Sequence, residues 1–380
     1  MIYIIILSYQ SPDDVRRCVE SVLRTNERPE RFRVVVVDNA STEDTRAALS
    51  EFDGRIDVIL ESENTGYAGG MNVGIRHALQ HGAEYVVLLN QDTEVDPTWL
   101  THLRAAMESD TRIAAAQPRI MYGGSDAPHD DLVNSVGNEI HVLGFGYAGG
   151  HGERWSAIRS RLHGYPYPEV TYCSGAAVMY RARALIDVAL QKLEVRSEKS
   201  EEDNSQISTL NSQFFDEDYF LYHEDLDIGV RFWLRDWSSV LVPNAVVTHH
   251  YEFSRSIAKL YWMERNRMLF LYQNFRLPTL LLLALPLLVS ELGMLMIARR
   301  GGWLKEKLRA WRSLGSVTRW HTYYAHRRMK QAKRMLPDRA IIRRLSPVLA
   351  NQEVSSPLVD HIVNPLVSLW WRCVLPFIRW

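Results

Sequence analysis

Residues 85–92 read Tyr85-Val86-Val87-Leu88-Leu89-Asn90-Gln91-Asp92, an apolar run that stops at three polar residues. A continuous apolar run of this length is typical of a strand buried on both faces, as strands of parallel sheets are. Three more such runs occupy residues 3–7, 34–37 and 57–60. Segments with helical spacing separate the runs, at residues 12–24, 41–52 and 71–81. The alternation predicts an α/β fold, with a Rossmann-like, mostly parallel sheet flanked by helices.

Beyond residue 93 the pattern becomes irregular. Strands are predicted at residues 170–180 and 240–247, with a helix over residues 225–233 between them. Residues 191–213 are polar and charged, which is typical of a mobile insertion. We expect residues 1–275 to form the main α/β domain and residues 276–380 to form a separate helical region.

The predicted helical region has the composition of a membrane-associating segment. Residues 277–298 carry one charge, Glu291, and are long enough to span a bilayer. Pro278, Pro286 and Glu291 argue instead for a broken or interfacial helix, and the spanning and interfacial readings both stay open. A buried soluble helix is the weaker third reading. Residues 299–344 hold fifteen Lys or Arg and two acids, so they carry about +13 and the rest of the chain, at −1 overall, about −14.

An anionic membrane surface is the partner that this charge distribution favours, because Trp370, Trp371, Trp380 and nearby arginines suit an interface. A solvated helix face is the plainer alternative, and nucleic acid is disfavoured because the sequence has no recognised binding motif. Cys18, Cys173 and Cys373 have neither zinc spacing nor a disulfide framework, which fits a reducing compartment. The apolar N-terminus is too short for a signal peptide.

Ligands of open α/β sheets bind beyond the carboxyl ends of the strands, so polar residues that follow each run are site candidates. Asp92 could bind a hard divalent ion with phosphate oxygens, although an aspartate after a strand is more often a turn residue. Asp38 could accept the N3–H of a pyrimidine or cap the next helix, and both roles can hold together.

Residues 64–74 form a glycine-rich stretch that leads into a predicted helix, where a diphosphate would be favoured. The stretch has neither a Walker lysine nor dinucleotide-fingerprint spacing, and a plain turn is the alternative. His223-Glu224-Asp225-Leu226-Asp227 crowds acids at a helix start, where a raised carboxyl pKa would suit a general base. A surface helix start is the plainer reading. His249 and His250 follow a strand and could ligate a metal.

The order of these motifs along residues 2–275 is more specific than any one of them. The chain has, in sequence, Ser8-Tyr9, Asp38-Asn39-Ala-Ser41, Asn64-x-Gly-Tyr-Ala-Gly-Gly-x-Asn72-x-Gly, Asn90-Gln91-Asp92, Ser174-Gly175-Ala176, Tyr222-His-Glu224-Asp225-Leu-Asp227, His249 and Tyr261-x-x-x-Arg265-Asn266. This set resembles the family 2 glycosyltransferases with the GT-A fold. The similarity is greatest to the branch that includes rhamnosyltransferases of cell-envelope polysaccharide synthesis.

The resemblance implies a role for each matching position. Asp225 would be the general base, with Glu224 as second choice. Asp92 and His249 would bind a divalent metal, Mg or Mn, and His250 competes for the histidine role. The aspartate that usually opens the metal motif is replaced by Asn90, which leaves one carboxylate fewer.

The other matches fall on the donor and acceptor sides. Gly175 and Ala176 would lie on the acceptor side, and Asp38 would read the pyrimidine. The full set of positions implied for the nucleoside diphosphate sugar is Ser8, Tyr9, Asp38, Asn39, Asn64, Gly69, Gly70, Asn72, Asn90, Gln91, Arg265 and Asn266.

The implied activity is inverting, metal-dependent transfer of a hexose, with rhamnose a candidate, from a UDP- or dTDP-linked donor. The acceptor would be a glycan or a polyprenyl-linked glycan at the cytoplasmic face of the cell membrane. A non-catalytic sugar-nucleotide-binding scaffold subunit is the alternative, and it predicts degraded motifs. A nucleotidyltransferase would need a basic glycine-rich loop after Leu7, and a processive synthase a Gln-x-x-Arg-Trp motif. The sequence has neither.

Overall fold

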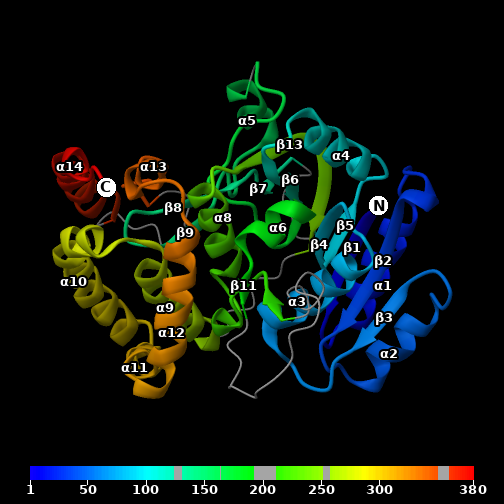
Figure 1. The fold of residues 1–380 in the computed structure, drawn as a ribbon, viewed down its shortest axis with the longest axis horizontal. Helices are drawn as coiled ribbons and strands as arrows, with labels where there is room; N and C mark the ends of the chain where they lie inside the picture. The colour runs from blue at the N-terminus through cyan, green and yellow to red at the C-terminus, as the bar shows by residue number, and fades with distance from the viewer. Residues whose placement is uncertain (124–130, 163, 192–210, 251–256, 350–358) are drawn as a thin grey trace, which may run out of the picture.

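The computed structural model describes residues 1–123, 131–162, 164–191, 211–250, 257–349 and 359–380, and a nine-stranded sheet runs through its centre (Figure 1). The strands of this sheet are β1 (Ile2–Ser8), β2 (Phe32–Asp38), β3 (Asp57–Leu60), β4 (Tyr85–Asn90), β5 (Thr93–Val95), β6 (Ile113–Tyr122), β7 (Val133–Ser135), β10 (Ala177–Arg181) and β13 (Ser238–His249).

The strand order is β3-β2-β1-β4-β10-β6-β13-β5, with β7 paired to β6. Strands β1 to β4 are parallel to one another, as predicted. β10 runs antiparallel between β4 and β6, and β5 runs antiparallel to β13. Because β10 is reversed, its first residues lie at the same edge as the carboxyl end of β4, where Ala177 pairs with Leu89.

Helices cover the sheet and extend beyond it. They are α1 (Pro12–Leu23), α2 (Glu43–Ser50), α3 (Gly66–Gln80), α4 (Trp99–Ser109), α5 (Trp155–Arg161), α6 (Ala182–Val188), α8 (Glu224–Leu234), α9 (Ile257–Asn274), α10 (Leu277–Arg300), α11 (Leu304–Leu314), α12 (Val317–Lys333), α13 (Asp338–Ile342) and α14 (Asn364–Val374). Two small ribbons, β8 (Asn138–Ile140) with β9 (Gly146–Ala148) and β11 (Leu190–Gln191) with β12 (Ser212–Gln213), complete the described strands.

The two faces of the sheet each have a hydrophobic core, because successive side chains of a strand point to opposite sides. Ile4 and Ile6 of β1 belong to the cluster that α1 and α4 cover. Tyr3 and Ile5 belong to the cluster on the other face, with residues of α3, α6 and α8. Burial on both faces therefore accounts for the continuous apolar runs of β1, β2 and β4. The run at residues 57–60 is predicted to be buried in the same way, but β3 lies at the edge of the sheet and three of its four residues are exposed.

A third core joins the C-terminal helices to the sheet domain. Leu226 of α8 and Phe270 of α9 share it with Leu283 of α10, Tyr323 of α12 and Trp371 of α14. The C-terminal helices α10 to α14 gather at the end of the molecule opposite β2 and β3 (Figure 1). The predicted boundary at residue 275 therefore lies inside a shared core.

Two of the predicted elements have other bounds in the structure, and β5, α4 and β6 lie in the stretch after residue 93 where no element was predicted. The helix predicted at residues 71–81 begins at Gly66, whose φ of +72° turns the chain into α3. The strand predicted at residues 170–180 is limited to β10, because the Ser174 and Gly175 amides bond the side chains of Gln117 and Asp225 instead of a neighbouring strand. Most of the predicted insertion, residues 192–210, lies outside the described residues, while Gln191 pairs with Ser212.

Candidate active site

The carboxyl ends of β1 and β4 are tied together by Gln91. Its side-chain oxygen accepts from the Tyr9 amide at 2.7 Å, and its nitrogen donates to the Tyr9 carbonyl at 2.9 Å. Ser8 is fully buried beside this link, and among the described residues its hydroxyl has no hydrogen-bond partner. The exposed Tyr9 ring is thus held at the edge that also carries Asn90 and Asp92.

Asp38, at the end of β2, is fully buried and has two protein partners. One carboxylate oxygen accepts from the Ser41 amide, and the other from Arg46 Nε, each at 3.2 Å. These contacts fix the turn that leads into α2. The carboxylate keeps spare lone pairs, since each oxygen accepts one of the two bonds it can take.

Asn39 and Asn64 are bonded to each other and to the start of α3. Asn39 Nδ2 donates to Asn64 Oδ1 and to the Gly66 carbonyl, each at 3.1 Å, and its Oδ1 accepts from the Thr65 amide at 3.0 Å. Asn64 Oδ1 also accepts from the Gly66 amide at 2.8 Å. The two side chains therefore shape the entry to α3.

The glycines of α3 serve close packing of the helix against β1. A Cβ at Gly70 would lie 2.4 Å from Leu7 Cδ1, and one at Gly74 would lie 2.3 Å from Ile5 Cγ2. The N-terminus of α3 is also occupied, since the Ala68 amide donates to the Phe220 carbonyl at 3.2 Å. Gly69 faces Thr65 instead, whose Cβ lies 2.5 Å from where a Gly69 Cβ would be, and the diphosphate role of Gly69 and Gly70 stays a prediction.

Asn72, also expected on the donor side, anchors the segment before α8. It is fully buried, its Oδ1 accepts from the amides of Phe214 and Phe215, and its Nδ2 donates to the Phe215 carbonyl at 2.8 Å. The fold gives this side chain a structural task, and its donor role stays a prediction.

The two expected metal ligands, 157 residues apart, lie side by side. β5 pairs with the end of β13, and His249 Nε2 lies 3.2 Å from Asp92 Oδ1. His249 Nδ1 lies 3.4 Å from Asn134 Oδ1, an arrangement that suits an Nδ1–H donor and an Nε2 lone pair on the Asp92 side. The competing His250 lies 2.7 Å from Glu94 instead.

Asp225, at the start of α8, contacts Gly175, which lies just before β10. Its Oδ2 accepts from the Gly175 amide at 3.1 Å, and its Oδ1 accepts from its neighbour Leu226 at 2.7 Å. The Gly175 carbonyl accepts in turn from the Tyr67 hydroxyl of α3 at 2.6 Å. Sequence reasoning assigned no role to Tyr67, although it lies in the glycine-rich motif.

Burial sets the protonation of the two adjacent acids. Burial raises the pKa of Asp225 to about 6, with backbone amides acting in the opposite direction. Burial, followed by the charge of Asp225, raises the pKa of Glu224 well above its ordinary value. Of the two, Asp225 is the carboxyl group that ionises near neutral pH, as a general base requires.

The segment immediately before Asp225 has strained backbone. Phe220, Tyr222 and His223 have φ of 61°, 68° and 71°, a region that non-glycine residues rarely adopt. Asn266 Nδ2 donates to the carbonyls of Tyr219, Leu221 and Tyr222, at 2.9, 2.9 and 2.7 Å. Arg265 bonds the carbonyls of Asp218 and Tyr219. These contacts occupy both side chains, whose expected diphosphate role stays a prediction.

A buried ion network fixes the same segment from the C-terminal side. Lys330 of α12 lies 2.9 Å from Asp216 and 2.8 Å from Asp227, and all three side chains are fully buried. His326 lies 3.0 Å from Asp216 and 3.3 Å from Asp218. Although burial opposes it, Asp216 raises the pKa of His326 to about 9. Asp216, Asp218 and His326 also lie close enough together to enclose a cation.

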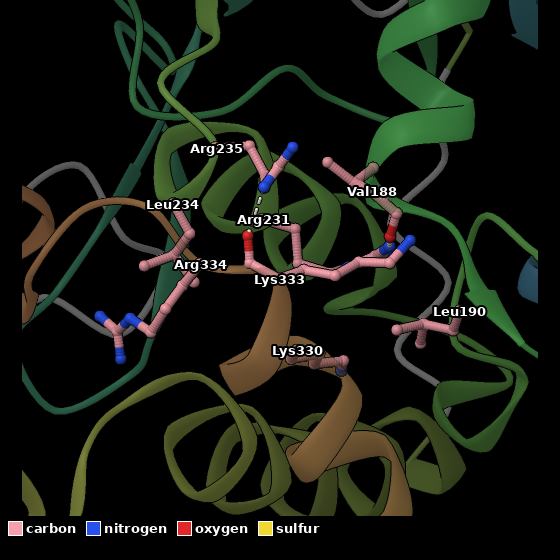
Figure 2. A pocket seen from close by; sticks show the side chains of 8 residues that line it. All are labelled: Val188, Leu190, Arg231, Leu234, Arg235, Lys330, Lys333 and Arg334. Carbon is pink, nitrogen blue, oxygen red and sulfur yellow. Dashed lines mark hydrogen bonds between the residues drawn. The ribbon is translucent and has the colours of Figure 1, made fainter.

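Figure 2 shows a small hollow between α8 and α12 that is lined by cations. Its lining includes Arg231, Arg235, Lys330, Lys333 and Arg334. Arg231 pairs with Asp227, Arg235 with Asp187, Lys330 with Asp216 and Arg334 with Asp338, while Lys333 donates to backbone carbonyls. Four of these five cations are therefore paired with acids, and the hollow is a structural junction.

Comparison with known proteins identifies relatives of this chain. Residues 3–189 match the family model described as "Glycosyl transferase family 2". The chain is 32% identical over 141 residues to the low-salt glycan biosynthesis hexosyltransferase Agl10 of Haloferax volcanii, covering 35% of this chain and 43% of that protein. It is 25% identical over 260 residues to the N-acetylglucosaminyl-diphospho-decaprenol L-rhamnosyltransferase of Mycobacterium tuberculosis, covering 65% of this chain and 75% of that protein.

A solved structure has the same fold. GalNAc-T7 with UDP, GalNAc and Mn2+ superposes with a TM-score of 0.52 over 72% of this chain and 48% of that chain, at 14% sequence identity. At this identity the likeness shows the fold alone. The match with Agl10 likewise spans less than half of that relative's length.

Proposed function

Residues 3–189 belong to glycosyl transferase family 2, and on that premise we propose that this chain transfers a sugar from a nucleoside diphosphate to a glycan or polyprenyl-linked acceptor, with inversion. Asp225 is the proposed general base. Asp92 and His249 are the proposed metal ligands. The donor is a UDP- or dTDP-linked sugar, with rhamnose favoured because one relative is named an L-rhamnosyltransferase.

One chain of contacts supports the proposal more than any other observation. The Asn90 amide, two residues before Asp92, donates to the Ala176 carbonyl at 3.0 Å. The adjacent Gly175 amide donates to Asp225. The carboxylate that would receive the acceptor proton and the carboxylate that would face the donor diphosphate therefore flank one link between β4 and β10, as a single displacement requires.

The residues at the proposed metal site fit a hard divalent ion. Asp92 and His249 present one oxygen and one nitrogen 3.2 Å apart, close to the ~3 Å that separates adjacent octahedral ligands at 2.0–2.2 Å from a metal. With Asn90 in place of an aspartate, the donor diphosphate would supply much of the remaining coordination. A bound metal would neutralise the charge that develops on the leaving diphosphate.

The chain's own residues carry the rest of the proposed mechanism. Ionised Asp225 would take the proton of the acceptor hydroxyl as the hydroxyl attacks the anomeric carbon from the side opposite the diphosphate, which inverts that centre. Gly175 and Leu226 hold the carboxylate through their amides. Asp38 would accept from the pyrimidine ring, with Ser8, Tyr9 and Gln91 beside the nucleotide.

The proposed setting is the cytoplasmic face of a cell membrane, as part of envelope polysaccharide synthesis. A relative named for a decaprenol-linked sugar supports a lipid-linked acceptor. The helix α10 is long and apolar enough to cross a membrane, by length and composition. Together these favour an enzyme that takes a soluble donor and works at the membrane surface.

The first test is thermal unfolding with UDP, dTDP or GDP, each with and without Mn²⁺. A ligand at 100 times its Kd stabilises a protein by about 2.7 kcal/mol, which shifts the Tm by several degrees. We expect stabilisation by UDP or dTDP that depends on Mn²⁺ and is lost in His249→Ala. His250→Ala is the matched control and should keep it. A chain that no nucleotide stabilises, with or without the metal, would contradict the proposal.

A further inference from the structure

Helix α10 has one buried stripe and a broad exposed apolar face. The buried residues are Thr279, Leu283, Leu287, Glu291 and Ala298, a spacing that follows one side of a helix. The exposed face carries Leu281, Leu285, Leu288, Val289, Leu292 and Met296, each between 53% and 76% exposed. A ridge of large aliphatic side chains along the whole helix is more than a soluble surface normally presents.

Polar contacts attach α10 to the protein along its length. Near its start, Thr279 Oγ1 bonds Asp338 and accepts from Trp380 Nε1 at 2.9 Å. Past its middle, Glu291 lies 2.9 Å from Lys307 Nζ and accepts from Trp311 Nε1 at 2.6 Å. At its end, the Ala298 carbonyl accepts from the Trp303 amide at 3.0 Å. The helix lies flat against the helical region.

The contacts of Glu291 bear on the orientation of α10 in a membrane. Glu291 belongs to a buried cluster with Arg267 and Glu264 of α9 and Lys307 of α11. A spanning α10, about 36 Å long for 24 residues, would draw these four charges and their helices into hydrocarbon. Charged groups there are costly even when paired.

The surroundings of the apolar face match an anionic bilayer. Ten of the fifteen Lys and Arg between residues 299 and 344 are exposed, whereas the two acids of that segment, Glu306 and Asp338, are partly or fully buried. Helix α14, at the same end of the molecule (Figure 1), adds the exposed Leu366, Leu369 and Arg372. Exposed aliphatic side chains in a region rich in exposed cations are typical of helices that lie in an anionic membrane surface.

We propose that α10 docks in the plane of an anionic bilayer, with the face from Leu281 to Met296 in the acyl boundary and the Glu264–Arg267–Glu291–Lys307 cluster above it. The proposal rests on the proposed function for its choice of a membrane as partner. It selects the in-plane orientation of α10 over the membrane-spanning one. The enzyme would be monotopic, attached from a single side.

Depth of insertion distinguishes the orientations. In a Cys373→Ser background, we would place single cysteines at Leu281, Leu288 or Met296 and attach an environment-sensitive fluorophore. The labelled full-length protein would be added to vesicles of phosphatidylcholine with about 30 mol % phosphatidylglycerol that carry lipid quenchers at set depths. In-plane docking predicts the same shallow depth at all three positions. A gradient with Leu288 deepest would overturn the proposal in favour of a span.

Flotation with the same vesicles tests the docking face itself. Leu281→Glu/Leu285→Glu should lower the bound fraction at least about tenfold, because two exposed leucines no longer enter the apolar layer. Leu60→Glu is the matched control, since Leu60 is 55% exposed on β3 at the other end of the molecule, and it should bind like the wild type. Equal binding by both variants, or self-association through this face without vesicles, would overturn the proposal.

Nucleotide-dependent thermal stabilisation, measured on the same variants, separates this inference from the proposed function. The double variant should bind vesicles poorly and still be stabilised by nucleotide. If no nucleotide stabilises the wild type, that result counts against the proposed function. A depth gradient would count against the in-plane orientation alone.

Discussion

At the scale of single residues, the environment of Asp225 decides its chemistry. The side chain accepts two backbone amides, yet its burial keeps the carboxyl pKa near 6. Its neighbour Glu224 is more deeply perturbed and has a carboxylate oxygen without a hydrogen-bond partner among the described residues. Two adjacent acids with pKa values pushed apart indicate one base and one neutral acid near pH 7.

Replacing Asp225 by asparagine should remove the base and keep its shape. We expect Asp225→Asn to lower the transfer rate by about 10²–10⁴-fold, the usual contribution of a positioned base. The affinity for nucleotide, measured by calorimetry, should stay within a few-fold of the wild type. Glu224→Gln is the matched variant and should retain more activity. Near-normal transfer by Asp225→Asn would show that the base is another group.

The pH dependence of transfer follows from the same burial. The base works in its ionised form, and its raised pKa of about 6 means that protonation begins just below neutral pH. The rate should therefore be constant above pH 7, half-maximal near the pKa and lower by about tenfold per pH unit below it. Initial transfer rates between pH 4.5 and 8 would measure this fall in rate, with folding checked by circular dichroism. A constant rate down to pH 4.5 would contradict this assignment.

At the scale of elements, α9 connects the proposed base to the proposed docking helix. Arg265 and Asn266 bond carbonyls of the segment before α8, whereas Glu264 and Arg267 join the ion cluster with α10. One turn of α9 thus contacts both the segment before α8 and the ion cluster that includes Glu291 of α10. Strained backbone of this kind persists because surrounding contacts fix it.

Asn266 should therefore act as a positioning residue. Asn266→Ala removes three bonds to a segment with three positive-φ residues, so that segment should relax and misplace Asp225. We expect kcat to fall about 10–100-fold, because small displacements of a catalytic group are costly, while KM for the donor changes less. Gln331→Ala, which removes two bonds to the carbonyls of Gln273 and Asn274, is the control and should leave kcat unchanged. A change in donor KM alone would indicate the diphosphate role instead.

At the scale of the whole molecule, the C-terminal helices pack as one body with the elements that carry the proposed base. They share a core with α8 and α9, and Lys330 supplies the buried cation for Asp216 and Asp227. Deleting residues 277–380 would expose that core, remove both cationic partners of Asp216 and leave Asp227 with Arg231 alone, so truncation would confuse membrane release with unfolding. Point substitutions on exposed side chains are the cleaner test of attachment.

Lys330 should contribute strongly to stability because it is fully buried between two acids. Lys330→Met keeps the volume and removes the charge, and we expect it to lower the free energy of unfolding by about 3–5 kcal/mol, the usual effect of breaking a buried pair from one side. Urea unfolding at pH 7 would measure it. Arg112→Met, which breaks an exposed pair with Asp110, should change stability by less than about 1 kcal/mol. Equal effects of both would contradict this role.

The sequence by itself determined the parallel strands β1 to β4 and the positions of the motifs. Apolar runs buried on both faces specify parallel strands, and residues that follow such runs must lie at the carboxyl edge, as Asp38 and Asp92 do. These are local patterns, and each is set by a few consecutive residues. The family relation followed from their order along the chain.

The tertiary structure decided which distant residues meet. It placed the side chain of His249, and not that of His250, beside the Asp92 carboxylate. It also brought Asn72 and Asn266 into hydrogen bonds with segments distant in the sequence, and Lys330 into contact with Asp227. It also used Gly70 and Gly74 of α3 for packing against β1. Such contacts depend on strand register and on which helix faces meet, which are settled by burying the whole core at once and leave no local signal in the sequence.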